Sequence, residues 1–242
     1  MEGMTSSMPG GPLLAADNLT KTYGSTAALA GISLAVYPGE AVAVMGASGS
    51  GKTTLLHCLA GIIRPDTGSV RLFRSGAPVE VTALDDDARS ALRRSDFGFV
   101  FQQGLLIPEL TAGENVALAL MLNGAPRAEA EQAAVQALAA LGLAGMEQRR
   151  IGELSGGQAQ RVAIARAQVN GARVLFADEP TGALDSHTSA EVMGLLLRTV
   201  EGTGRSLVVV THDPSVARWC GRVITVADGR IVADTAGAGR TR

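Results

Sequence analysis

Short apolar runs alternate with segments of helical periodicity along most of the chain. The apolar runs have the length and β-branched content of buried strands, and they are Leu13–Leu19, Ile32–Val36, Ala41–Met45, Ser69–Phe73, Phe97–Phe101, Val174–Ala177, Leu207–Thr211, Val223–Val226 and Ile231–Ala233. Between them, the spacing of apolar positions predicts helices over Lys52–Gly61, Asp86–Arg94, Ala112–Leu122, Arg127–Leu141, Gly157–Asn170, Thr188–Val200 and Pro214–Cys220. Alternation of strands and helices is typical of βαβ units, so the pattern predicts the α/β fold class.

The interval Thr111–Asn170 interrupts this alternation, because it is helical almost throughout. We expect it to form a helical subdomain inserted in the α/β core and not an independent domain. Residues 1–12 and 236–242 are rich in small and polar residues and are expected to be flexible tails, which leaves residues 13–235 as a single domain. No internal repeat of roughly 20–50 residues is visible.

Composition narrows the classes of function. Hydrophobic residues make up 46% of the 242 residues and charged residues 18%, which excludes a disordered or coiled-coil chain. The formal net charge is −2 and aromatic residues are 3%, so the chain lacks the basic excess and the stacking side chains of a general nucleic-acid binder. The longest strongly apolar runs, Val116–Leu122 and Leu207–Val210, fall far short of the roughly 18 residues that a membrane span needs.

The cysteines and lysines add two further observations. Cys58 and Cys220 lie far apart in the sequence and form no CxxC motif, which favours a reduced, cytosolic protein without a cysteine metal site. Residues 1–12 contain no apolar core, so no secretory signal is expected. Lysine is rare, since Lys21 and Lys52 are the only two lysines among the 21 basic residues.

A glycine-rich loop follows the apolar strand Ala41–Met45 and leads into a predicted helix. Its sequence fits the pattern GxxxxGK[ST], in the strand–loop–helix context that this pattern requires. Glycines let the backbone N–H groups turn inward around phosphate, and the N-terminus of the helix adds its dipole. Lys52 supplies a positive charge for the β- and γ-phosphates, and the Thr53 hydroxyl is placed to ligate Mg²⁺. The expected nucleotide-binding residues are Gly46, Ala47, Ser48, Gly49, Ser50, Gly51, Lys52, Thr53 and Thr54.

The alternative for this loop is a glycine-rich turn with a solvated lysine. Agreement at eight positions and on both flanks favours the phosphate-binding interpretation. The motif predicts binding of a nucleoside triphosphate, but by itself it does not distinguish a GTPase, a kinase, a helicase or a transporter motor.

A second apolar strand, Val174–Ala177, ends in Asp178 and Glu179. A divalent cation beside a triphosphate needs a carboxylate ligand, and Asp178 at a strand end is expected to face the glycine-rich loop. Glu179 leaves the strand one residue later and is expected to orient or deprotonate an attacking water. The alternative is an exposed acidic turn before Pro180, and the presence of the phosphate loop favours the catalytic interpretation.

The motif Leu-Ser-Gly-Gly-Gln at residues 154–158 is the most specific segment of the chain. Ser155 is a good helix N-cap, two glycines allow close backbone approach and a helix follows, so this is a second candidate anion-binding helix end. The motif resembles the signature of ATP-binding cassette (ABC) proteins, and its distance before Asp178 agrees with that family. The resemblance implies two ATP molecules sandwiched between two copies of the chain, with the γ-phosphate on one copy contacted by the other copy's Ser155, Gly156, Gly157 and Gln158.

Further positions resemble functional residues of the same family. Tyr23 resembles the aromatic residue that stacks on adenine, and a purely structural tyrosine is the alternative. Gln102 resembles the glutamine that senses Mg²⁺ and the attacking water, although the adjacent Gln103 competes for this assignment. Asp185, in the segment Ala-Leu-Asp, resembles the residue of the loop that crosses the dimer interface.

His212 follows the strand Leu207–Thr211 and resembles the switch histidine that reaches the γ-phosphate. His57 and His187 have no such counterpart and are expected to be bystanders. The resemblance therefore implies a catalytic set of Glu179, His212 and Gln102, and a set of Mg²⁺ ligands formed by Thr53, Gln102 and Asp178.

The resemblance covers about residues 13–233. Three segments, 98–102, 110–116 and 182–188, are similar to the group that includes macrolide and peptide exporters, lipoprotein-release systems and the cell-division cassette. Membership implies a P-loop NTPase of the ABC ATPase type, whose RecA-like core carries an antiparallel β-subdomain and a helical subdomain. Ala159 and Gln168 stand where the group more often has Gln and Leu, which weakens assignment to one subtype.

The same resemblance implies that a homodimer of this chain hydrolyses ATP. The energy of hydrolysis would drive a separate integral membrane permease with an extracytoplasmic domain, in export, lipoprotein release or transmission of force. The chain would then be peripheral at the cytoplasmic face of the cell membrane, and no nucleic-acid partner is expected.

Two alternatives remain at the level of sequence. A non-transport ABC ATPase acting on nucleic acid or the ribosome usually needs a coiled-coil insertion, a zinc insertion or two fused cassettes. Here only 103 residues separate Lys52 from Ser155, and no cysteine cluster exists. An ATP-binding regulator without turnover is disfavoured by Glu179 and His212.

An apolar cluster follows Gln102, in a segment that Gly104 and Pro108 keep from being a regular helix. Core packing is the ordinary explanation. If the three apolar side chains are instead exposed to water, they favour a surface that binds a partner, because exposed apolar clusters are costly. In the resembled family this loop borders the groove for the permease's coupling helix. We therefore predict that at least two of Leu105, Leu106 and Ile107 are exposed in the isolated chain.

Overall fold

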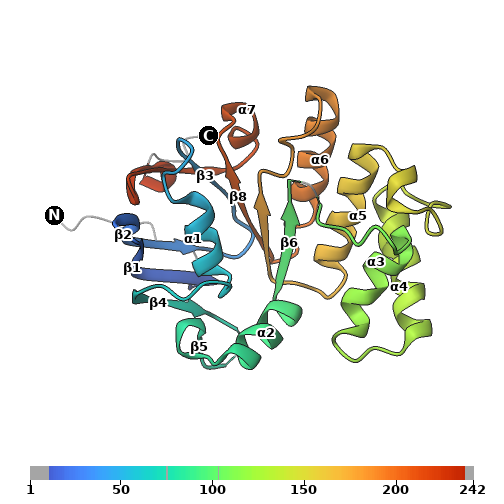
Figure 1. Ribbon diagram of the computed structural model, residues 1–242, viewed down its shortest axis with the longest axis horizontal. Coiled ribbons are helices and arrows are strands. Elements are labelled where there is room, and N and C mark those ends of the chain that lie inside the picture. The colour runs from blue at the N-terminus through green and yellow to red at the C-terminus, as the bar shows by residue number, and fades with distance from the viewer. Residues whose placement is uncertain (1–10, 75, 103, 238–242) are drawn as a thin grey trace.

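Two β-sheets and the helices around them form the frame of the molecule in a computed structural model (Figure 1). The structure describes residues 11–74, 76–102 and 104–237, so Gln103 and most of both expected tails lie outside the described residues. The strands are β1 (Leu14–Tyr23), β2 (Thr26–Val36), β3 (Ala41–Met45), β4 (Thr67–Leu72), β5 (Val79–Glu80), β6 (Phe97–Phe101), β7 (Val174–Asp178), β8 (Ser206–Thr211), β9 (Arg222–Ala227) and β10 (Arg230–Asp234). The α-helices are α1 (Lys52–Leu59), α2 (Asp86–Ser95), α3 (Ala112–Met121), α4 (Arg127–Ala140), α5 (Gly156–Gln168), α6 (Ser186–Arg198) and α7 (Pro214–Ala217). Short 3₁₀ helices cover Val81–Ala83, Ile151–Glu153 and Thr235–Gly237.

The larger sheet has the strand order β10-β9-β3-β8-β7-β6. Its strands run parallel except for β10, which pairs antiparallel with β9. Strands β3, β7 and β8 are neighbours and consist almost wholly of buried apolar residues, as expected for a parallel sheet covered on both faces. Their carboxyl ends therefore lie at one edge of the sheet, and the candidate site residues follow these ends.

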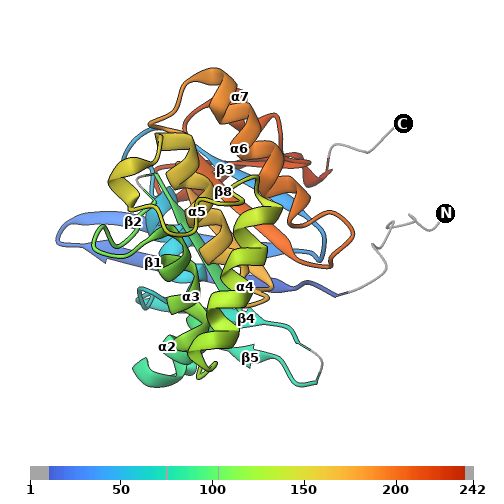
Figure 2. The same cartoon turned by 90° about the vertical axis from the view of Figure 1, so that its right-hand side faces the viewer.

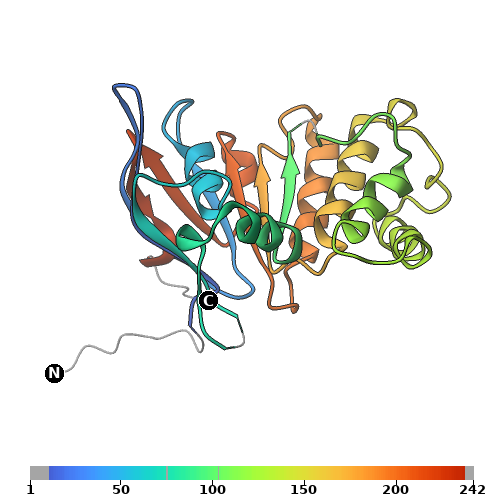
Figure 3. The ribbon, with the colours of Figure 1, turned by 60° about the horizontal axis from the view of Figure 1, so that its bottom comes forward.

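The smaller sheet is antiparallel, with the order β2-β1-β4-β5. Helix α1 lies between this sheet and the parallel sheet (Figure 3). One hydrophobic core fills this layer, and it includes Leu14 and Val36 from the small sheet, Leu56 from α1 and Phe176 from the large sheet. The glycine-rich loop at the start of α1 is thereby held between two rigid sheets.

Helices cover the opposite face of the parallel sheet. Helices α5 and α6 lie nearest to it, and α3 and α4 pack outside α5 (Figures 2 and 3). A second core joins these helices to the sheet through side chains such as Leu138, Val162, Leu175 and Met193. Among the described residues, no helix has the length and apolar character needed to cross a membrane.

The predicted α/β class with an antiparallel β-subdomain and a helical subdomain is confirmed, and the nine strands and seven helices appear in the predicted order. The differences are one additional short strand and the positions of several element ends. Strand β5 was missed, because two residues are too short for an alternating pattern. Strand β2 begins six residues before the predicted Ile32, because its early residues pair with β1 although they are only partly buried.

Candidate functional site

The glycine-rich loop after β3 fits between two neighbouring backbones. Gly46 and Gly51 have φ values of 153° and 102°, in the region that favours glycine. A Cβ at Gly46 would lie 2.1 Å from the Val226 carbonyl oxygen, and one at Gly51 would lie 2.1 Å from the Ala28 carbonyl oxygen. Neither position can therefore carry a side chain, and the loop backbone packs directly against β9 and β2 where α1 begins.

Lys52 is the first residue of α1 and is 7% exposed. Its Nζ donates hydrogen bonds to the carbonyl oxygens of Gly46 and Ala47, both at 2.8 Å. An ammonium group has three donors, so one N–H remains for an anion in the loop. The Ser50 Oγ is buried and has no hydrogen-bond partner within the described part of the chain, which is a second polar atom that a phosphate would satisfy.

Thr53 and Asp178 bring together the two oxygens expected to hold Mg²⁺. The Thr53 Oγ1 donates to the Asp178 Oδ1 at 3.5 Å, across the gap between α1 and the end of β7. Burial raises the pKa of the Asp178 carboxyl above its ordinary value, while His57, the hydrogen bond from Thr53 and Lys52 act in the opposite direction. A hydroxyl and a carboxylate are ligands that suit this hard cation, so the residues present fit it.

His57 was expected to be a bystander, and the structure gives it a place near this pair. It lies on α1, one turn after Thr53. Burial lowers the pKa of the His57 imidazole, and the charge of Asp178 partly offsets that effect. His57 is thus an electrostatic neighbour of Asp178, and its position on the helix at i+4 from Thr53 is the sequence signal that indicates this.

Glu179 is held by the end of the neighbouring strand β8. Its Oε1 lies 2.7 Å from the His212 Nδ1 and accepts from the His212 backbone N–H at 3.1 Å, and its Oε2 accepts from the Thr211 Oγ1 at 3.2 Å. Because a carboxylate only accepts, Nδ1 is the protonated nitrogen of the imidazole in this contact. Glu179 has a φ of 47°, which is uncommon for a side chain of this size and indicates a constrained turn.

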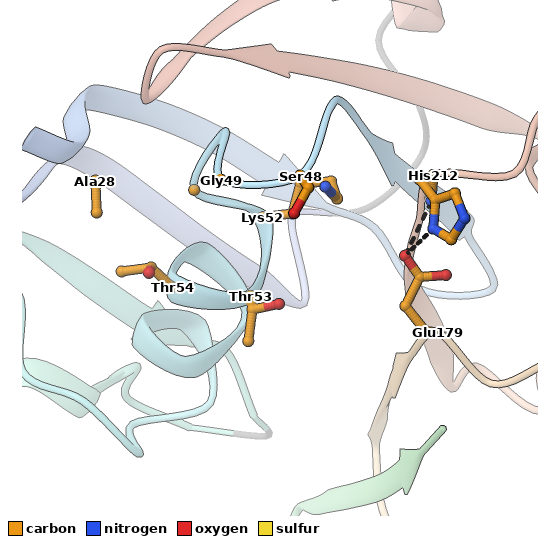
Figure 4. A pocket seen from close by; sticks show the side chains of 9 residues that line it. Ala28, Ser48, Gly49, Lys52, Thr53, Thr54, Glu179 and His212 are labelled. Carbon is orange, nitrogen blue, oxygen red and sulfur yellow. Dashed lines mark hydrogen bonds and ion pairs between the residues drawn. The ribbon is translucent and has the colours of Figure 1, made fainter. Parts of the chain in front are cut away.

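These residues surround one pocket of about 270 Å³. Glu179 and His212 lie across it from Lys52 and Thr53 (Figure 4). The pocket is lined by Ala28, Ser48, Gly49, Gly51, Lys52, Thr53, Thr54, Glu179 and His212. Ala28 on β2 was missed, because nothing in its sequence context indicates that the β1–β2 hairpin reaches the loop.

Gln102 and Tyr23 do not line this pocket. Gln102 follows β6, whose last residue Phe101 pairs with Asp178 in the sheet. The Gln102 side chain lies against Gly182: a Cβ atom placed on Gly182 would come within 2.8 Å of the Gln102 Nε2. Tyr23 ends β1 and is 49% exposed. The expected contacts of Gln102 with Mg²⁺ and of Tyr23 with adenine therefore stay predictions.

The motif at 154–158 also lies outside the pocket. Ser155 caps α5 as expected: its Oγ accepts from the Gln158 N–H, and the Gln158 Oε1 accepts from the Ser155 N–H. Ser155 and Gly156 are exposed, so the capped N-terminus of this helix faces outward. Asp185 caps α6, and its carboxylate accepts hydrogen bonds from His187 and from Thr188.

Comparison with known families identifies this arrangement. A family model described as "ABC transporter" matches residues 29–182, which is more than half of the chain and includes the glycine-rich loop, Asp178 and Glu179. The chain belongs to the ABC transporter family. It is an ATPase cassette, and ATP with Mg²⁺ is its substrate complex.

Curated relatives and solved structures of ABC proteins agree with this identification. The macrolide export ATP-binding/permease protein MacB of Chromobacterium violaceum is 46% identical over 214 residues, which cover 88% of this cassette and 32% of MacB. The pyoverdine export ATP-binding/permease protein PvdT of Pseudomonas entomophila is 46% identical over 230 residues, covering 93% and 34%. The cassette thus spans about a third of the length of these relatives.

The solved dimeric structure of the ATP-binding cassette MJ0796, bound to ADP and Pi in a post-hydrolysis state, is 40% identical to this cassette. It has a TM-score of 0.81 and covers 91% of this chain and 97% of its own. The ABC ATPase fold predicted from the sequence is therefore confirmed over almost the whole described chain.

The contacts around Tyr23 yield a prediction for ATP binding by the cassette. Asp66 accepts from the Lys21 Nζ at 2.8 Å and from the Thr22 N–H at 2.7 Å, and its own N–H donates to the Thr20 carbonyl oxygen. The Lys21 Nζ lies 5.7 Å from the centroid of the Tyr23 ring. Asp66 therefore fixes the residues immediately before Tyr23.

If Tyr23 stacks on adenine, Asp66→Ala is expected to raise the KM for ATP about two- to fivefold and to leave kcat unchanged, because the backbone and the Lys21 side chain next to the ring lose their support. Steady-state hydrolysis assays measure both constants. Asp17→Ala is the control, because Asp17 is an exposed residue on β1, the strand that also carries Tyr23. A lower kcat at unchanged KM would contradict the proposed link to adenine.

Proposed function

We propose that two copies of the cassette close head to tail around two Mg·ATP, with the motif at 154–158 of each copy completing the site of the other. The exposed, capped N-terminus of α5 carries this proposal, because it is an anion-binding helix end that does not line its own chain's pocket. The dimeric form of the MJ0796 cassette supports it. Trapping of a Glu179→Gln dimer in the presence of Mg·ATP tests the sandwich.

Within each site, the chain's own groups divide the work of hydrolysis. Lys52 and the loop N–H groups bind the phosphates and neutralise their charge. Thr53 and Asp178 would hold Mg²⁺, which would add positive charge beside the β- and γ-phosphates. The Glu179 carboxylate accepts a proton from the attacking water, and the hydrogen bonds from His212 and Thr211 fix its orientation.

The proposed work of the cassette is to drive a membrane permease in export, lipoprotein release or transmission of force. The names of MacB and PvdT support a role in export. A permease with an extracytoplasmic domain would bind the cassette and hold it at the cytoplasmic face of the membrane.

The permease is proposed to dock at the free edge of the parallel sheet. A groove of about 330 Å³ runs along the edge strand β6 between α2, α3 and α5. Phe99 and Phe101 line it with their rings stacked, and the exposed Leu105 and Leu122 extend its apolar surface. Among the described residues that line it there are arginines and no acidic side chains, so a partner segment with an apolar face and a carboxylate would be complementary.

The loop beside this groove has the exposure predicted from the sequence. Leu105 is 59% exposed and Ile107 is 39% exposed. Leu106 is only half-buried and packs against the second core, so a charge at this position would disturb folding as well as docking. The Arg166 guanidinium donates to the Gly104 and Leu105 carbonyl oxygens, both at 2.7 Å, and fixes the loop backbone while the Leu105 side chain stays exposed.

We expect Leu105→Glu to abolish association with the membrane protein that co-purifies with the wild-type cassette, and to leave ATP binding unchanged. Burial of a leucine side chain in an interface is worth about 1.5–3 kcal/mol, and a carboxylate in its place has to be desolvated when the partner binds. Detergent extraction followed by affinity purification measures the association. Val232→Glu, at an equally exposed position on β10, is the matched control. Equal recovery of the membrane protein with both variants would rule out docking at this loop.

A further inference from the structure

A buried glutamine on α5 joins the ends of two strands of the parallel sheet. Gln160 is 3% exposed. Its Nε2 donates hydrogen bonds to the Phe101 carbonyl oxygen at 3.1 Å and to the Pro180 carbonyl oxygen at 2.7 Å. The Phe101 carbonyl oxygen also accepts from the Gly104 N–H at 2.9 Å. A buried carbonyl group that loses its donor is costly, so the Gln160 amide ties the Pro180 carbonyl, just beyond the end of β7, to the helix and links it to the end of β6.

Both acceptors are next to residues of the ATPase site. Phe101 immediately precedes Gln102, and Pro180 immediately follows Glu179. Phe101 also pairs with Asp178, so the two strand ends lie side by side. On its other side Glu179 is tied to β8 by its N–H, which donates to the Val210 carbonyl oxygen. A displacement of Pro180 relative to β8 would therefore change the orientation of the Glu179 carboxylate.

Helix α5 is placed to transmit such a displacement. Gly98 on β6 approaches the helix so closely that a Cβ there would lie 2.1 Å from the Ala167 carbonyl oxygen. The same helix begins at the exposed cap Ser155, about one and a half turns before Gln160. The same helix thus has an exposed N-terminus, which is proposed to bind the partner's ATP, and a side chain that holds the catalytic loop of its own chain.

We propose that Gln160 is a positioning residue that couples the two ATP sites of the dimer. Contact of Ser155 with the ATP held by the partner copy shifts α5, and Gln160 carries that shift to Phe101 and Pro180 of its own chain. Closure of the opposite site thus favours the catalytic orientation of Glu179. This inference rests on the proposed sandwich dimer.

The test separates closure of the dimer from hydrolysis. Gln160→Met keeps the length of the side chain and removes both hydrogen bonds. We expect kcat to fall about 10–100-fold, the effect of a small displacement of a catalytic group, with an unchanged KM for ATP. In the Glu179→Gln background, where hydrolysis does not obscure assembly, Gln160→Met is expected to form the ATP-dependent dimer as readily as Glu179→Gln alone. Gln168→Met, on the same helix, is the matched control and should retain wild-type kcat.

Each outcome has a distinct meaning. A kcat for Gln160→Met within twofold of the control would overturn the inference. Loss of dimerisation in the Glu179→Gln background would also overturn it, because Gln160 would then support the Ser155 end itself. If Gln160→Met melts well below the wild type, Gln160→Asn replaces it: the amide is retained but is too short to reach both carbonyls, and the same split between kcat and dimerisation is expected. Failure of Glu179→Gln with intact Gln160 to dimerise would count against the sandwich instead.

Discussion

Replacement of Glu179 by glutamine is expected to lower kcat by about 10²–10⁴-fold, the usual contribution of a general base, and to leave ATP binding intact. The carboxamide occupies the same volume beside His212 and Thr211 but does not take a proton from water. Binding is spared because the phosphates are held by Lys52 and the loop on the opposite side of the pocket. Single-turnover hydrolysis and equilibrium binding of ATP measure the two effects, and Glu201→Gln, an exposed change after α6, is the control.

The same variant tests whether the site is shared between two copies. Stalled hydrolysis leaves ATP in place, so the proposed sandwich should accumulate as a dimer on gel filtration in Mg·ATP and return to monomer when ATP is removed. A Glu179→Gln protein that remains monomeric while saturated with ATP would exclude the sandwich and would leave the ATPase assignment unaffected.

The elements that carry the site could be predicted because each has a local signal. Strand β3 is a short apolar run followed by a glycine, and β7 is a similar run that ends in Asp178 and is followed by Glu179. The cap at Ser155 follows from residue type, and the structure shows the reciprocal pair with Gln158 that this type favours. In these cases, neighbours in the sequence determine the local conformation, so a pattern of a few residues is sufficient.

Contacts between distant segments have no such signal. The hydrogen bond between His212 and Glu179 depends on β7 and β8 being neighbours, and strand order is not encoded in the alternation of apolar and polar positions. The sequence does not distinguish Gln160 either, because in a helical pattern it is one polar residue among several. Only its burial against two strand ends shows that the side chain has a specific task.

Two single-site variants should separate the halves of the composite site. Lys52→Ala is expected to weaken ATP binding by more than about 30-fold, because it removes the charge that offsets the β- and γ-phosphates in a nearly buried position. Ser155→Arg is expected to bind ATP like the wild type and to hydrolyse almost none, since Ser155 does not line its own chain's pocket. Equilibrium titration of each chain with ATP and a turnover assay measure these effects. Equal loss of ATP binding in both variants would assign Ser155 to its own chain's site.

A mixture of the two inactive chains is then expected to recover hydrolysis. A mixed dimer keeps one site in which Lys52 of the Ser155→Arg chain meets Ser155 of the Lys52→Ala chain, and its other site carries both changes. Half of randomly formed dimers are mixed and each keeps one of two sites, so the upper limit is about a quarter of wild-type turnover per chain. If Gln160 couples the two sites as proposed, recovery falls about 10–100-fold below this limit, because the other site of the mixed dimer cannot close. Recovery should vanish when the Ser155→Arg chain also carries Glu179→Gln, because that chain supplies the general base of the restored site. It should persist when Glu179→Gln is placed on the Lys52→Ala chain instead, and the opposite pattern would show that the signature and the catalytic glutamate of one site come from the same chain.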